Sequence, residues 1–152
     1  MDFREILTET EYVADLKGGT KEEVLRELVH LLVGRGRIRP EAEDAVYQAV
    51  WEREQDISTG IQDGIAMPHG RIAEVDRLVT LLALKKEGMD FEALDGNRTC
   101  IFAFSVVSPL DPQSYMEYLG NMSKALGRAS VREALLAAET DDAMRRILLD
   151  AL

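Results

Sequence analysis

The stretch Thr99–Val107, with the sequence TCIFAFSVV, is apolar except for one threonine and one serine. Successive side chains of a strand point to opposite faces of its sheet, so this run would carry apolar side chains on both faces. Such a strand must be covered on both sides. The stretch therefore predicts a central strand of a buried sheet, in which Cys100 is a buried structural thiol.

Shorter strand-like runs precede this stretch. Arg77–Leu84 and Met89–Phe91 are separated by Gly88, and an Asp95-Gly96-Asn97 turn leads from them into the apolar run. Glycine and asparagine between apolar segments are typical of the turns that join neighbouring strands. We expect three strands in this region and a further short strand at residues 12–16, YVADL.

Helix signals lie on either side of the strand region. Thr20 and Glu23 form a capping-box pattern before residues 21–34, where apolar residues recur at helical spacing. Pro40 suits the first position of a helix that would end near Glu54. Three further helices are expected, one from Asp111-Pro112 to Gly127, one from a capping box at Ser130 and Glu133, and a last one that opens at Thr140.

This order of helices, strands and helices predicts an α/β layered sandwich in which helices cover both faces of the sheet. The length of 152 residues fits a single domain over residues 1–152. No segment rich in proline, serine or glycine suggests a linker.

Composition and residue spacing exclude several classes of function. The formal net charge is −10, and the 18 basic residues are scattered among 28 acidic ones, which argues against nucleic acid as a partner. No run is long and apolar enough to span a membrane and the N-terminus lacks a signal peptide, so we expect a cytoplasmic protein without membrane insertion. The distant His30 and His69 and the lone cysteine fit no metal site, and no P-loop or G-x-S-x-G motif is present. We expect neither a metal nor a cofactor.

The segment Ser58–Arg71, STGIQDGIAMPHGR, presents His69 between a proline and a glycine. Proline fixes the backbone before the imidazole, and we interpret Gly70 as freedom for a large partner to approach. A neutral imidazole is a nucleophile at pH 7 and can carry a phosphoryl group. The alternative is a histidine at a strand end whose hydrogen bonds are satisfied. His30, by contrast, faces away from the apolar stripe of its helix and is expected in solvent.

A phosphoryl dianion in this acidic protein would need a nearby cation. Arg53 continues the apolar stripe Ala42, Val46, Ala49 and Val50 of its helix, which makes it the leading candidate. The other interpretation is a cation at a helix C-terminus whose stem reaches water. The hydroxyls of Ser58 and Thr59 are candidates for further hydrogen bonds to a phosphoryl group.

These residues match a known family pattern. Arg53-Glu54, Ser58-Thr59-Gly60-Ile61 and Gly64–His69 closely resemble the signature of the enzyme IIA domains of the bacterial phosphoenolpyruvate:sugar phosphotransferase system, in its fructose/mannitol class, which includes nitrogen-regulatory IIA proteins. Met89-Asp90-Phe91, Asp95-Gly96 and the strand ending in Ser108-Pro109 extend the match to nearly the whole chain. The resemblance implies a mixed sheet flanked by helices, His69 as phosphoacceptor from an HPr-type carrier, and Arg53 beside it.

The chain departs from the family at one position. The family commonly has a second active-site histidine where this chain has Tyr115. A tyrosine can donate a hydrogen bond to a phosphoryl oxygen but does not change its charge near neutral pH; alternatively, Tyr115 faces the core at a helix start.

Three functions therefore stay open. The first is a phosphotransferase that passes the group to a IIB component in sugar transport. The second is a regulatory module whose phosphorylation controls binding to transporters, kinases or other partners, and the third is a scaffold that no longer accepts phosphate.

Overall fold

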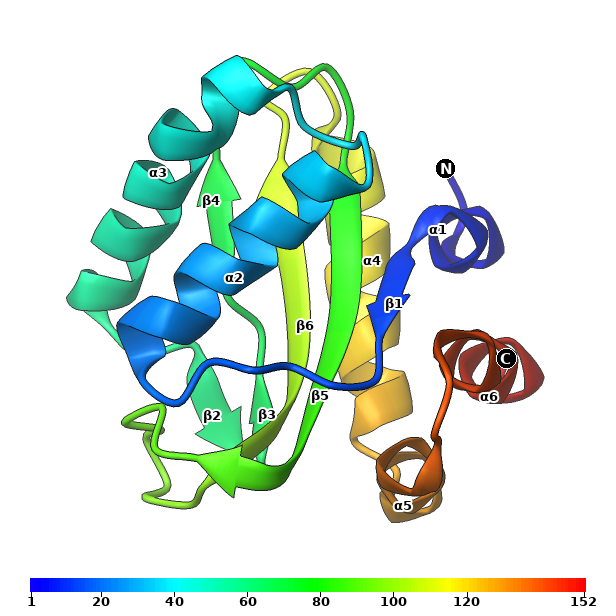
Figure 1. The fold of residues 1–152 in the computed structure, drawn as a ribbon. Coiled ribbons are helices and arrows are strands. Elements are labelled where there is room, and N and C mark those ends of the chain that lie inside the picture. The colour runs from blue at the N-terminus through cyan, green and yellow to red at the C-terminus, as the bar shows by residue number, and fades with distance from the viewer.

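The computed structural model describes residues 1–152. Its helices and strands are α1 (Phe3–Glu9), β1 (Glu11–Val13), α2 (Lys21–Gly34), a 3-10 turn η1 (Pro40–Ala42), α3 (Glu43–Asp56), β2 (Gly60–Gln62), β3 (Ile65–Ala66), β4 (His69–Arg71), β5 (Val79–Met89), β6 (Thr99–Val107), α4 (Pro112–Leu126), α5 (Ala129–Ala137) and α6 (Asp141–Asp150) (Figure 1). No helix among them is both long and apolar enough to cross a membrane.

One six-stranded sheet runs through the molecule, and five of its strands follow the order β1-β5-β6-β3-β2. The sixth strand, β4, pairs with β6 on the same side as β3 but nearer the C-terminal end of β6. Strand β6 is antiparallel to β5 and parallel to β3 and β4. Strands β1 and β5 are parallel, and β2 and β3 are antiparallel. The mixed sheet implied by the family resemblance is thus confirmed, as is the central position of the Thr99–Val107 strand.

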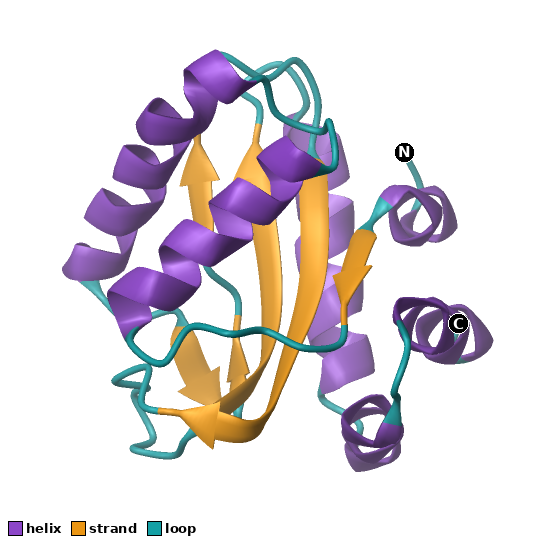
Figure 2. Ribbon diagram, in the orientation of Figure 1, coloured by secondary structure: helices purple, strands orange, loops and turns teal.

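The side chains of β6 explain why the sheet needs two layers of helices. Phe102, Phe104 and Val106 enter one apolar core, and Ile101, Ala103 and Val107, which point to the opposite face, enter the other. Helices α2 and α3 complete the first core, and α1, α4, α5 and α6 complete the second. Figure 2 shows the strands between these two groups of helices, so the predicted α/β sandwich is confirmed.

The helix predictions hold with two corrections. Helix α2 has the predicted bounds, and both hydrogen bonds of the Thr20–Glu23 capping box are present. The segment from Pro40 begins as a 3-10 turn, and only Glu43 starts the α-helix. The proposed capping box at Ser130 is wrong, because α5 already begins at Ala129 without a side-chain cap.

The strand predictions need larger corrections. Arg77–Leu84 and Met89–Phe91 are not two strands; β5 runs through Gly88 as a single strand ending at Met89. The pairing register with β6 shifts between Leu84 and Met89, and Gly88 absorbs the shift with a φ of +72°. The N-terminal strand is shorter than residues 12–16. Helix α1 and strands β2, β3 and β4 were not predicted. None of them is longer than seven residues, which is too short for a helical or strand periodicity of apolar residues to be recognised.

Cys100 lies on β6 as expected, but its side chain is only partly buried. Its Sγ atom lies beside Gly88, 3.2 Å from a Cβ atom placed there, and the glycine has no side chain to cover the thiol. This burial still raises the pKa of the thiol above its ordinary value.

Candidate functional site

His69 is the first residue of β4, the short strand that pairs with β6 on the side opposite β5. His69 pairs with Ser105 and Arg71 with Val107, so these two side chains of β4 share the sheet face that carries α4. Gly70 between them faces α3 on the opposite side. Strand β4 has no second neighbour, and the imidazole therefore sits at an edge of the sheet where a partner can reach it.

The structure gives Gly70 a different role from the one inferred from the sequence. Gly70 is buried, and a Cβ atom there would lie 2.8 Å from Cγ2 of Val50. Its φ is not in the left-handed region, so backbone freedom is not used. The glycine lets α3 pack directly on β4, and the interpretation that it admits a partner's approach is wrong.

The imidazole of His69 is held by one hydrogen bond to the main chain. Its Nδ1 atom lies 3.2 Å from the carbonyl oxygen of Met67. Because a carbonyl oxygen can only accept, Nδ1 carries the proton of the neutral ring and Nε2 keeps its lone pair. The sequence-based alternative of a histidine with satisfied hydrogen bonds holds for only one of the two ring nitrogens.

The surroundings of His69 favour the neutral ring. Burial of the side chain is the main cause that lowers its pKa below the ordinary value of 6.5, and the charges of Arg53 and Arg71 lower it further. The hydrogen bond to Met67 and the charge of Glu54 act in the opposite direction without cancelling the shift. At pH 7 the imidazole is therefore a neutral nucleophile.

An open pocket of about 690 Å³ lies over His69. It is bounded by α3, by β4 with the end of β6, and by the first turns of α4. Its lining residues are Ala49, Glu52, Arg53, Gln55, Asp56, His69, Arg71, Val107 and Tyr115. The structure thus brings together three of the five residues singled out from the sequence, namely His69, Arg53 and Tyr115.

Both interpretations of Arg53 from the sequence describe part of what it does. Its guanidinium donates a hydrogen bond of 2.8 Å to the carbonyl oxygen of Ile57, the residue that follows α3. The same side chain lines the pocket and forms no ion pair with a carboxylate. Arg53 stabilises a helix end and leaves its remaining donors available in the pocket.

Arg71 is the basic pocket residue that sequence analysis missed, and the acidic Glu52 and Asp56, which also line the pocket, were not singled out either. It is exposed, it forms no ion pair, and its charge acts on the imidazole of His69. The available signal was its spacing: two residues after His69 on a strand, a side chain returns to the same face. That signal needed β4 to be recognised as a strand, and three residues are too few for a pattern.

Tyr115 lies against the imidazole. The two ring centroids are 5.9 Å apart with the ring planes tilted by 45°. Burial is the main cause that raises the pKa of Tyr115, so its hydroxyl keeps its proton and stays a hydrogen-bond donor at neutral pH. Tyr115 also packs beside the second core, so the core-facing and pocket-facing interpretations both apply.

The hydroxyls of Ser58 and Thr59 do not line this pocket. Thr59 is buried and donates both its N–H and its hydroxyl to the carboxylate of Glu54. The Ser58 hydroxyl oxygen accepts a hydrogen bond of 3.1 Å from the N–H of Gly60. Both side chains organise the loop that follows α3.

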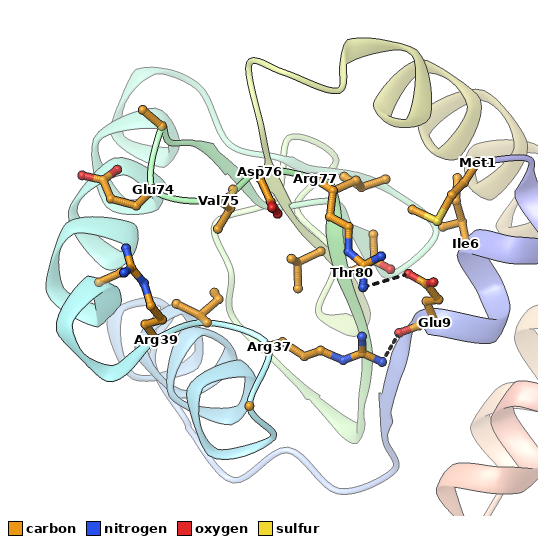
Figure 3. A pocket seen from close by; sticks show the side chains of 16 residues that line it. Met1, Ile6, Glu9, Arg37, Arg39, Glu74, Val75, Asp76, Arg77 and Thr80 are labelled. Carbon is orange, nitrogen blue, oxygen red and sulfur yellow. Dashed lines mark hydrogen bonds and ion pairs between the residues drawn. The ribbon is translucent and has the colours of Figure 1, made fainter.

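A second hollow of about 430 Å³ lies near the start of β5 (Figure 3). Two of its arginines are already engaged, since Arg77 pairs with the Glu9 carboxylate at 3.6 Å and Arg37 donates to the Glu9 carbonyl at 2.8 Å. No histidine or cysteine lines it.

The other histidine, His30, is exposed on α2. Its Nδ1 atom lies 3.1 Å from Oε1 of Glu43, and its predicted surface position is confirmed.

Comparisons with known proteins point to one family. A family model described as "Phosphoenolpyruvate-dependent sugar phosphotransferase system, EIIA 2" matches residues 5–151. A fructose-specific EIIABC component of Bacillus subtilis is 31% identical over 97% of this chain, which spans 23% of that larger protein. A nitrogen regulatory protein of Pseudomonas aeruginosa is 29% identical, with 97% of this chain and 95% of the relative covered. The crystal structure of the nitrogen regulatory protein IIA-Ntr from Neisseria meningitidis superimposes with a TM-score of 0.82 at 27% identity, covering 95% of this chain and 97% of that one.

Proposed function

The chain belongs to the type 2 EIIA family of the phosphoenolpyruvate-dependent sugar phosphotransferase system, and we propose that it carries a phosphoryl group on Nε2 of His69. One observation carries this proposal. The Met67 carbonyl holds the proton on Nδ1, which leaves Nε2 as the free lone pair in a pocket that also contains Arg53 and Arg71.

The phosphoryl donor is an HPr-type carrier that bears a phosphohistidine. Nε2 of His69 attacks phosphorus in line, a new N–P bond forms, and the N–P bond of the donor breaks with its electron pair returning to the donor imidazole. The Nδ1 proton of His69 stays in its hydrogen bond to Met67, so no base is needed to remove it. Catalysis consists of positioning and charge stabilisation.

Arg53, Arg71 and Tyr115 stabilise the charge of the transferred group. The guanidinium donors of Arg53 and Arg71 approach it from α3 and β4, and the Tyr115 hydroxyl approaches from α4. Charge-assisted hydrogen bonds of this kind are roughly twice as strong as neutral ones. Glu52 and Asp56 also line the pocket, so the two guanidinium groups offset these nearby carboxylates, whereas salt screens the more distant charges over about 8 Å.

Phosphorylation in vitro tests this assignment. Incubation with phosphoenolpyruvate, enzyme I and HPr should give an acid-labile adduct, and His69→Ala should abolish it. His30→Ala is the matched control, because it removes an exposed imidazole outside the pocket and should leave the adduct intact. Phosphate on the His69→Ala protein would refute the assignment.

The next recipient distinguishes two functions. In the first, the group passes to a IIB component in sugar transport, as the name of the Bacillus subtilis relative suggests. In the second, phosphorylation is a regulatory signal read by a transporter, a kinase or another partner. The Pseudomonas aeruginosa and Neisseria meningitidis relatives are named as nitrogen regulatory proteins, and they support this second function.

A comparison of bound partners separates these functions. Phosphorylated protein and the His69→Ala variant are each used to capture partners from the source cell. A cysteine-containing IIB component that becomes phosphorylated by the captured protein supports sugar transport. A partner that binds only one of the two forms and receives no phosphate supports regulation.

A further inference from the structure

Glu54 is a buried carboxylate directly behind the pocket. Its side chain is 1% exposed, which is costly for a charged group unless it is paired and fully hydrogen-bonded. Oε2 accepts from the Thr59 N–H at 2.9 Å and lies 2.9 Å from Nζ of Lys21. Oε1 accepts from the Thr59 hydroxyl. Glu54 therefore fixes both the main chain and the side chain of Thr59.

The hydrogen bonds continue from Thr59 to the imidazole. The Thr59 carbonyl accepts from the Met67 N–H at 3.1 Å. The Met67 carbonyl then accepts from Nδ1 of His69 at 3.2 Å. An unbroken series of contacts thus runs from Glu54 through Thr59 and Met67 to the ring nitrogen that sets the tautomer of His69.

Lys21 anchors the far end of this series. Its side chain is 11% exposed, and its ammonium lies 4.7 Å from the ring centroid of Phe91, beside the carboxylate of Glu54. The pair connects the first residue of α2 to the last turn of α3. The carboxylate is thereby held from one side by a neighbouring helix and from the other by Thr59.

We propose that Glu54 is a positioning residue for His69, acting through Thr59 and Met67 to hold the proton on Nδ1 and to direct Nε2 into the pocket. The expected effect on phosphoryl transfer rests on the proposed function. The effect on the tautomer and orientation of the ring does not, because both can be measured without any transfer. Glu54 does not line the pocket, and it acts only through other residues.

The test uses an apolar replacement of the whole pair, Lys21→Met with Glu54→Leu. Removing both charges avoids an unpaired buried charge, and apolar replacement of a buried ion pair is often neutral for stability. Lys21→Met with Glu54→Gln is the conservative variant, because it also leaves no unpaired charge and the amide can still accept from the Thr59 N–H and donate to the Thr59 hydroxyl. Glu11→Gln is the matched control. Glu11 is a carboxylate of β1 that pairs with Arg35 and Arg37, and it takes no part in the series of contacts that leads to His69.

The readout is the ¹⁵N spectrum of the His69 ring at a pH where the ring is neutral. In the wild type we expect one protonated Nδ1 and one unprotonated Nε2 signal, well separated. In the apolar double variant both tautomers of the neutral ring should be populated, so the ¹⁵N shifts of Nδ1 and Nε2 should move toward each other. The phosphorylation rate should fall roughly ten- to hundredfold. Lys21→Met with Glu54→Gln should keep the wild-type spectrum, and Glu11→Gln should not change it.

The proposal would be overturned if the folded apolar double variant showed the same well-separated Nδ1 and Nε2 signals as the wild type. If the double variant does not fold, Thr59→Val removes one of the two bonds to Glu54, and Thr59→Ser keeps it; equal ring spectra for these two would overturn the proposal as well. A wild-type protein that accepts no phosphate would refute the proposed function alone, because the ring spectra still decide the role of Glu54.

Discussion

Gly70 and Val50 bring β4 and α3 into direct contact. A Cβ atom at Gly70 would lie 2.8 Å from Cγ2 of Val50 and 3.1 Å from its main-chain nitrogen. Arg53 follows Val50 by three residues on the helix, and His69 precedes Gly70 on the strand. The absence of one side chain therefore sets the distance between Arg53 and His69.

Gly70→Ala should reduce both stability and phosphoryl acceptance. The added methyl group overpacks the contact with Val50, and overpacking of a buried contact costs about 1–3 kcal/mol. Displacement of α3 would also move Arg53 away from His69. Chemical denaturation and the phosphorylation rate measure the two effects.

Gly120→Ala is the control for this substitution. Gly120 lies in α4, and nothing lies within 4 Å of a Cβ atom placed there. Alanine should stabilise the helix by about 0.5–1 kcal/mol and leave acceptance unchanged. Equal stabilities of the two variants would contradict the packing role of Gly70.

The lowered pKa of His69 gives a second prediction, on pH. In an NMR titration His69 should titrate below 6.5, because burial and the two neighbouring arginines disfavour its charged form. The native state then binds fewer protons than the unfolded chain, so the contribution of His69 to stability is present above pH 6.5 and is lost as the pH falls through its lowered pKa.

The variant Arg53→Ala provides the comparison for this titration. Removing a cation that lowers the pKa of His69 should raise that pKa toward its ordinary value. His69→Ala identifies the signal. A wild-type titration at or above pH 6.5 would contradict a buried, neutral nucleophile.

A third prediction concerns Arg71. Arg71→Ala should slow phosphoryl acceptance roughly ten- to hundredfold, which corresponds to the about 1.5–3 kcal/mol of a hydrogen bond to a charged group. Stability should change by no more than about 0.5 kcal/mol, because the side chain is exposed and makes no ion pair. Arg39→Ala removes another exposed arginine, from the hollow near β5, and should affect neither quantity. If Arg39→Ala and Arg71→Ala slow acceptance alike, the effect is general charge and not a contact.

These examples show which parts of the molecule the sequence could reveal. Long elements with a clear period were predictable: α2 was found to the residue, and the central β6 followed from apolar side chains on both faces. The short β4 was not, because three residues cannot display a period, and its last residue, Arg71, was missed with it. Hydroxyls near a histidine in sequence also misled, since the loop turns Thr59 toward Glu54.

Tyr115 gives the last prediction, because its ring and its hydroxyl can be tested separately. Tyr115→Phe keeps the ring that lies 5.9 Å from the imidazole and removes only the hydroxyl. If the hydroxyl donates to the anionic phosphoryl group, acceptance should fall roughly 10-fold, the equivalent of about 1.5 kcal/mol at the lower end for a hydrogen bond to a charged group. Stability should change little, because the hydroxyl has no hydrogen-bond partner within the protein. Tyr115→Leu should slow acceptance further, since the aromatic contact that confines the imidazole is then lost as well. Equal rates for Tyr115→Phe and the wild type would limit Tyr115 to packing, and the pocket would then hold the phosphoryl group through its two arginines alone.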